Sequence, residues 1–178
     1  MLTRFQATRF RQLAIGLGMA FFLAGCDRLD PSLEYEDYSF LGQPAPRFRM
    51  DGNEYPPQND VVLLEFWGLW CADCIEDAPH TARVRQMFAA EPRVTFSAVH
   101  AGEYGRWGSI DAYFAETGDP FDTLDDPAYN VSTRYDVNWF PSYLLIDRNG
   151  TIVHVQTTLS RRDGERRLVE AIQALLEH

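Results

Sequence analysis

Apolar residues in this chain form short runs with two different spacings. Compact apolar runs at 61–67 (VVLLEFW) and 94–99 (VTFSAV) have the length and composition of buried strands. An apolar run at 142–146 and a segment at 151–155 flank the turn-like stretch 147–150 (DRNG), which predicts a β-hairpin. A short strand is also expected at 47–50, ended by the turn-like residues 51–53.

Helical spacing occupies the stretches between these runs. Residues 72 to about 90 carry apolar side chains at helical intervals, with Pro79 placed to kink the helix. A second helix is expected at 109–117, with Ser109 as N-cap and Gly118 as its end. A short helical piece at 131–135 and an amphipathic helix at 164–177 complete the pattern. This order of elements predicts an α/β fold with a mixed sheet flanked by helices.

The first 25 residues have a different character. They contain Arg4, Arg9 and Arg11, no acidic residue, and an apolar run at 13–24. Such a run spans roughly 18 Å as a helix, well short of a hydrocarbon core of ~30 Å. The segment therefore predicts an export signal rather than a mature membrane helix. The alternative is an uncleaved signal anchor that leaves Cys26 as a free thiol.

Residues 23–26 (LAGC) resemble the lipobox of bacterial lipoproteins. In that family the cysteine sulfur receives a diacylglycerol and the signal is cut before the cysteine. The resemblance implies that Cys26 is lipidated, and two or three acyl chains would hold the protein firmly at a membrane. Asp27 resembles an inner-membrane retention signal of enterobacterial lipoproteins. We therefore expect the periplasmic face of the bacterial inner membrane.

Composition adds limits on the domain plan and the partners. The chain has 178 residues and 46% hydrophobic residues, which is enough for one folded domain. Residues 26–41 are acidic and lack an apolar period, so we expect a signal peptide at 1–25, a tether at 26–41 and a folded domain at 42–178. A formal charge of −10 disfavours general nucleic-acid binding. We expect no nucleic-acid partner and a monomer.

The candidate chemistry lies at Cys71 and Cys74, where a predicted strand ends and a predicted helix begins. Helix N-termini favour thiolates, so the first cysteine is placed to attack a disulfide and the second to resolve the mixed disulfide. Half of a zinc site is the alternative, but the four histidines (residues 80, 100, 154 and 178) show no ligand-pair spacing. A purely structural disulfide over so short a loop would constrain the unfolded chain little. We expect no metal and no cofactor.

Three segments together carry a more specific resemblance. They are 64–74 (LEFWGLWCADC), 41–48 (LGQPAPRF) and 135–150 (YDVNWFPSYLLIDRNG). They resemble the active-site segment, the lead-in and the cis-proline loop of the TlpA/ResA-like branch of the thioredoxin superfamily, which consists of membrane-anchored extracytoplasmic thiol-disulfide oxidoreductases. The resemblance covers roughly residues 41–176. It implies a thioredoxin-like fold with an insertion before the cis-proline loop.

This resemblance assigns roles to individual residues. Cys71 would be the nucleophile and Cys74 the buried resolving thiol. Pro141 would be a cis-proline facing the disulfide and exposing the Phe140 backbone to a substrate chain. Trp70 would pack beside the disulfide and contribute to substrate binding, and its alternative role is that of an ordinary core aromatic residue. The implied partners are protein disulfide substrates and an upstream membrane thiol donor.

Two acidic residues are further catalytic candidates. Glu65 lies inside an apolar strand, where an unpaired carboxylate is costly, and coincides with the buried acid of thioredoxin. Burial near Cys74 would raise its pKa and suit it to general acid–base work, whereas an outward-facing strand residue is the alternative. Asp77 aligns with an acidic residue that ResA-like proteins carry after the motif. Its alternative role is to complement the helix dipole from the first turn.

The sequence departs from the family pattern at two places. Asp73 replaces a common proline, and with Glu76 and Asp77 it puts three negative charges near Cys71. These charges should raise the pKa of the Cys71 thiol and favour a reductant over a general oxidase. Ser142 follows the proline where the cytochrome c maturation branch usually has Glu, which weakens assignment to that branch.

Other protein classes share single features with this chain. A copper-delivery protein of thioredoxin fold normally uses CxxxC with a distal histidine, but the spacing here is CxxC. A peroxidase of the peroxiredoxin type shares part of the lead-in but has different surroundings for its reactive cysteine. A lipid-anchored binding or scaffold protein with a structural disulfide stays open as an alternative to the enzyme.

Overall fold

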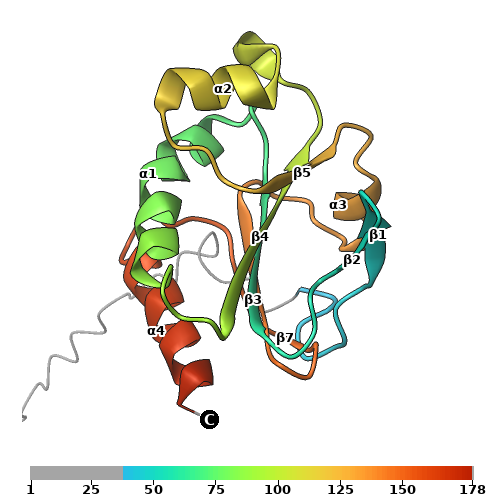
Figure 1. Ribbon diagram of the computed structural model, residues 1–178, viewed down its shortest axis with the longest axis vertical. Coiled ribbons are helices and arrows are strands. Elements are labelled where there is room, and N and C mark those ends of the chain that lie inside the picture. The colour runs from blue at the N-terminus through green and yellow to red at the C-terminus, as the bar shows by residue number, and fades with distance from the viewer. Residues whose placement is uncertain (1–37, 178) are drawn as a thin grey trace, which may run out of the picture.

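A five-stranded mixed sheet forms the centre of the computed structural model, which describes residues 38–177 (Figure 1). Its middle strand is β3 (Val61–Trp67), which runs parallel to β4 (Val94–Ala101). Beyond β4 lies β5 (Thr123–Asp126), also parallel. On the other side, β6 (Ser142–Ile146) is antiparallel to β3, and β7 (Ile152–Gln156) is antiparallel to β6. The α/β fold and the mixed sheet predicted from the sequence are therefore confirmed.

Helices cover both faces of this sheet (Figure 1). The helices α1 (Ala72–Met87) and α4 (Gly164–Leu176) pack on one face. The short helix α3 (Asn130–Arg134) lies on the opposite face, beside the hairpin of β1 (Phe48–Met50) and β2 (Asn53–Tyr55). This arrangement leaves β3 buried on both sides, which explains its nearly continuous apolar sequence.

The segment between β4 and β6 carries additional structure. A 3₁₀ turn, η1 (Gly105–Trp107), precedes α2 (Ile110–Thr117), and both lie at the end of the molecule from which α1 starts (Figure 1). Ser109 caps α2 through its hydroxyl, which accepts the N–H of Ala112 at 3.1 Å, and Gly118 ends the helix in the left-handed region. These two ends agree with the sequence prediction.

Several boundaries differ from the predictions. β2 and β5 were not expected, because the sequences NEY and TLDD are short and polar. β2 forms because Asp51 and Gly52 both have positive φ, as a two-residue hairpin turn requires. The α1 helix ends at Met87 rather than near residue 90, and it continues through Pro79.

Residues 38–41, expected in the tether, pack against the domain. Tyr38 is buried, and its hydroxyl donates to the carbonyl of Tyr135. Residues 38–41 therefore pack together with the folded domain. The predicted signal peptide, the lipid site Cys26 and the following Asp27 lie outside the described residues. Within 38–177, no helix has both the length and the apolar character needed to cross a bilayer.

Candidate active site

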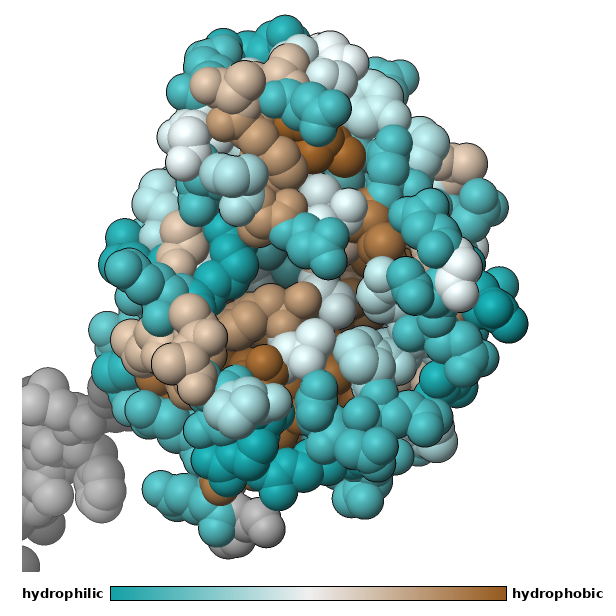
Figure 2. All heavy atoms as spheres, in the orientation of Figure 1, coloured by the Kyte–Doolittle hydropathy of each residue, from teal (hydrophilic) through white to brown (hydrophobic). Residues whose placement is uncertain are grey.

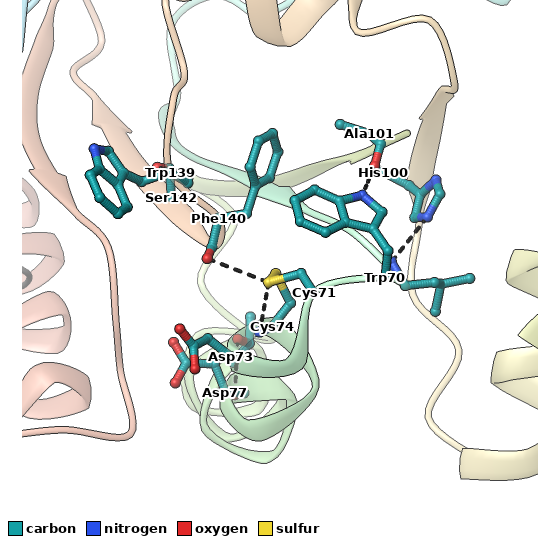
Figure 3. The surroundings of a disulfide bond; sticks show 12 residues. Trp70, Cys71, Asp73, Cys74, Asp77, His100, Ala101, Trp139, Phe140 and Ser142 are labelled. Carbon is teal, nitrogen blue, oxygen red and sulfur yellow. Dashed lines mark hydrogen bonds between the residues drawn. A yellow bond between two sulfur atoms is a disulfide. The ribbon is translucent and has the colours of Figure 1, made fainter. Parts of the chain in front are cut away.

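Cys71 and Cys74 form a disulfide at the junction of β3 and α1 (Figure 3). Cys71 is the N-cap of α1, and its sulfur accepts the backbone N–H of Cys74 at 3.1 Å. In the reduced protein the same N–H and the positive end of the helix dipole would stabilise a thiolate on Cys71. The positions therefore suit Cys71 to nucleophilic attack and Cys74 to resolution.

The loop before β6 closes over this disulfide. The Phe140–Pro141 peptide bond is cis, as the resemblance led us to expect at this proline. The carbonyl oxygen of Phe140 lies 3.4 Å from the Cys71 sulfur (Figure 3). Ser142, which departs from the family pattern, donates its hydroxyl to the carbonyl of Trp139 at 2.7 Å and so ties the loop together. The backbone before Pro141 thus borders the reactive sulfur.

Trp70 forms part of the rim of the site. Its side chain is 45% exposed, so it is not an ordinary core residue. The indole N–H donates to the carbonyl of Ala101 at 2.7 Å, and the ring meets Phe140 edge to face with centroids 5.4 Å apart. These contacts hold Trp70 beside the disulfide while leaving one side of the ring open.

Tyr129 is a further aromatic residue of this rim, and Trp139 is exposed in the loop before Pro141; sequence reasoning missed both. Tyr129 is 38% exposed and packs edge to face on Phe140, with centroids 6.4 Å apart, and Trp139 is 61% exposed. Gly102 is required beneath Tyr129, because its φ is +82° and a Cβ there would overlap the tyrosine hydroxyl. No local sequence signal distinguishes these rings from core aromatics.

Glu65 is buried under α1, which decides between its two predicted orientations. Burial raises its pKa from 4.5 to about 7; Asp77 and Asp119 add to the rise, whereas Arg85 opposes it. An Arg85 guanidinium nitrogen lies 3.8 Å from the carboxylate. The side chains of Glu65 and Arg85 line a small cavity of about 100 Å³, which lies in the hollow between α1 and β4 (Figure 2). Glu65 therefore has the proton affinity of a group that exchanges protons near neutral pH.

Asp77 is fully buried and holds a loop in place. One carboxylate oxygen accepts the N–H of Leu159 at 2.7 Å and the hydroxyl of Tyr143 at 3.2 Å, and the other accepts the N–H of Ser160 at 2.9 Å. The acidic residue in the first turn of α1 is Asp73, so the dipole role considered for Asp77 is wrong. The contacts show that Asp77 anchors the loop at 157–160 beneath α1.

The acidic residues around the motif are partly neutralised. Arg161 lies 3.5 Å from the Asp73 carboxylate, and both side chains are about half exposed. Asp77 is buried and faces backbone N–H donors, whereas Asp73 and Glu76 are both exposed to solvent. The negative field at Cys71 is therefore weaker than the count of acidic residues implied. Across residues 38–177, no group of three or more His, Cys, Asp or Glu side chains could hold a metal ion.

The chain matches the AhpC/TSA family over residues 41–155. It is 31% identical over 135 residues to the thiol-disulfide oxidoreductase ResA of Geobacillus kaustophilus, covering 72% of this chain and 76% of the relative. It is 27% identical over 146 residues to the soluble secreted antigen MPT53 of Mycobacterium tuberculosis, covering 80% of this chain and 78% of the relative.

Solved structures agree with the sequence relatives. A crystal structure of a putative thiol:disulfide interchange protein DsbE from Chlorobium tepidum superposes with a TM-score of 0.64 at 25% identity, covering 76% of this chain and 97% of that one. StoA from Bacillus subtilis has a TM-score of 0.58 at 16% identity, covering 71% and 96%, which supports the fold alone. The thioredoxin-like fold is thus confirmed, and the chain belongs to the AhpC/TSA family as a thiol-disulfide oxidoreductase of the ResA/DsbE type.

Proposed function

We propose that this protein is a lipid-anchored, extracytoplasmic reductant of protein disulfides. The observation that carries the proposal is the Cys71–Cys74 disulfide at the start of α1, with the Phe140 carbonyl against the Cys71 sulfur. The relative MPT53 is described as secreted, and the structural neighbour as a disulfide interchange protein. The first description supports an extracytoplasmic location, and the second supports thiol-disulfide exchange.

The proposed reaction begins from the reduced pair. The Cys71 thiolate attacks one sulfur of a substrate disulfide, forming a mixed disulfide and releasing the other substrate sulfur as a thiolate. Cys74 then loses its proton and attacks the Cys71 sulfur, which forms the intramolecular disulfide and frees the second substrate thiol. Two electrons pass to the substrate, and an upstream membrane thiol donor restores the reduced pair.

Within this reaction Glu65 is proposed as the acceptor of the Cys74 proton. A carboxyl group with a pKa of about 7 is half ionised near neutral pH, so it can take up and return a proton. We assign Asp77 a supporting role, because it holds the loop at 157–160 against the second turn of α1. Trp70, Phe140 and Pro141 are proposed to bind the substrate chain.

The proposed direction of electron flow rests on the acidic side chains near Cys71, although Arg161 partly neutralises Asp73 and N–H donors face Asp77. Negative side chains raise the pKa of a thiol and favour the disulfide form, which makes the reduced protein a better electron donor. Equilibration of the purified protein with glutathione measures this directly. A reducing potential close to that of thioredoxin, ~−270 mV, is expected, and a potential near −120 mV, about that of DsbA, would contradict the proposal.

Membrane attachment is proposed through lipid on Cys26, with Asp27 favouring the inner membrane. Replacing Cys26 with Ala in the producing bacterium should move the protein from the membrane fraction to the soluble extracytoplasmic fraction. Mass spectrometry of the N-terminal peptide should show a diacylglyceryl group on Cys26 of the unaltered protein. An unmodified Cys26 thiol would refute this part of the proposal.

Single cysteine variants distinguish an enzyme from the other protein classes considered. Cys71→Ser should abolish dithiol-linked reduction of insulin, and Cys74→Ser should stop turnover after the first attack. A scaffold protein would keep its partners in both variants, and a copper carrier would show metal-dependent transfer instead. A role in cytochrome c maturation is a narrower form of this proposal. Identifying the protein that the Cys74→Ser variant captures would test it.

A further inference from the structure

His100 occupies the end of β4, next to the strand that leads into the active site. It is fully buried, and its register partner across the parallel pair is Trp67, the last residue of β3. The backbone N–H of Leu69, two residues before Cys71, points to the imidazole Nε2 at 3.2 Å (Figure 3). The mechanism proposed above does not use this histidine.

The contact with Leu69 identifies the tautomer. A backbone N–H can only donate, so Nε2 must carry the lone pair and the proton must lie on Nδ1. That nitrogen is 3.2 Å from one oxygen of Asp125, to which it donates. The hydroxyl of Tyr104 donates to the other Asp125 oxygen at 2.7 Å, and its ring stacks on the imidazole with centroids 5.2 Å apart. Asp125 and Tyr104 therefore hold the ring in one orientation.

The group held by His100 is the turn that presents the nucleophile. The N–H of Cys71 donates to the carbonyl of Gly68 at 3.1 Å, which closes the turn. The two central residues of this turn both make hydrogen bonds to the end of β4. Leu69 donates to the His100 imidazole, and Trp70 donates to the carbonyl of Ala101. The position of the Cys71 sulfur relative to the Phe140 carbonyl thus depends on these two contacts.

We propose that His100 is a positioning residue for Cys71, acting as a neutral acceptor whose tautomer Asp125 and Tyr104 maintain. The inference rests on the proposed function, because it concerns the same nucleophile. The inference adds that His100 must be neutral, not protonated, for Cys71 to be held in place. Protonation of Nε2 would replace the acceptor with a second donor and release the Leu69 N–H.

The charged groups around His100 define the expected pH dependence. Asp125 faces it from β5 and Asp126 acts from the next position of the same strand, and both favour the imidazolium. Trp67 and Tyr104, which contact the ring, carry no charge near neutral pH. Burial is the largest effect and lowers the pKa of His100 from its ordinary value of 6.5. The neutral acceptor therefore persists at neutral pH and is lost in acid.

The test compares His100→Leu, His100→Gln and a matched control, His154→Leu. His154 is a partly buried histidine on β7, which lies on the other side of β3 from β4. The measurement is the single-turnover rate at which reduced protein attacks a small aromatic disulfide, across pH. Loss of one positioning hydrogen bond in His100→Leu should slow attack about tenfold. His154→Leu should stay within about twofold of the unaltered protein.

His100→Gln supplies an acceptor that does not titrate. It should recover most of the rate at neutral pH. Its rate relative to the unaltered protein should rise in acid, at pH values below the ordinary histidine pKa of 6.5, because burial lowers the pKa of His100. Equal rates for the unaltered protein and His100→Leu, or equal slowing in the Leu and Gln variants at every pH, would overturn the proposal.

A measurement on the unaltered protein covers the case in which His100→Leu does not fold. The ¹⁵N spectrum of the imidazoles at neutral pH should show His100 with the proton on Nδ1, and a proton on Nε2 would overturn the proposal. Failure of the proposed function would look different. The protein would then attack the small disulfide, with the same dependence on His100, but would not reduce protein disulfides.

Discussion

Glu65 offers the most quantitative consequence of this structure. Its pKa in the folded protein is about 7, against an ordinary value of 4.5, chiefly because burial disfavours the carboxylate. The folded state therefore binds more protons than the unfolded state between these two values, and stability falls as the pH rises through them. A difference of this size corresponds to roughly 3 kcal/mol of unfolding free energy above neutral pH.

Glu65→Gln removes this titration while keeping the shape of the side chain. Urea unfolding of the purified oxidised protein should be followed between about pH 4 and pH 8. The unfolding free energy of Glu65→Gln minus that of the unaltered protein should increase by roughly 3 kcal/mol from pH 4.5 to about pH 7 and then level off. Glu103→Gln, at an exposed glutamate, is the matched control for the loss of a carboxylate. A flat or falling difference for Glu65→Gln would refute the burial argument.

Further variants test the surroundings of Glu65, the contacts of Asp77 and the role of Trp70. Arg85→Gln should move the midpoint of the Glu65-dependent loss of stability to higher pH, because the cation 3.8 Å away lowers the pKa of Glu65; an unchanged midpoint in the same unfolding series would contradict this. Asp77→Ala should cost about 3–5 kcal/mol in urea unfolding, since it leaves the amides of Leu159 and Ser160 without their acceptor and leaves the Tyr143 hydroxyl with Thr81 alone. Asp77→Asn should cost less. In stopped-flow assays, Glu65→Gln should slow decay of the mixed disulfide roughly tenfold or more without slowing its formation. Trp70→Ala should lower kcat/KM for protein disulfides about threefold to tenfold, whereas Met87→Ala, an exposed residue at the far end of α1, should leave it unchanged.

The elements that local sequence determines were predicted with good accuracy. β3 is an apolar run buried on both faces, and α1 starts directly after it at the cysteine motif. Ser109 and Gly118 bound α2 through contacts within a few residues of each. β5 was missed because its four residues include two aspartates, one of which caps α3 by accepting three backbone N–H groups.

Side-chain roles that depend on distant segments could not be predicted. The orientation of Glu65 depends on α1 covering that face of β3 and on Tyr143 lying opposite it in β6. Two partners of Asp77 come from a loop more than 80 positions along the chain, and the third is Tyr143 in β6. For His100 the sequence did hold a usable signal. Parallel strands end at the same edge of a sheet, so a polar residue at the end of β4 lies beside the cysteine motif that follows β3.

Capture of the mixed disulfide tests the central claim most directly. Reduced Cys74→Ser protein is mixed with a peptide that contains one disulfide, and the adduct is located by mass spectrometry. We expect a stable adduct on Cys71, no adduct with Cys71→Ser, and rapid release of reduced peptide by the unaltered protein. An adduct confined to Cys74 in the Cys71→Ser protein, with none on Cys71 in the Cys74→Ser protein, would contradict this claim.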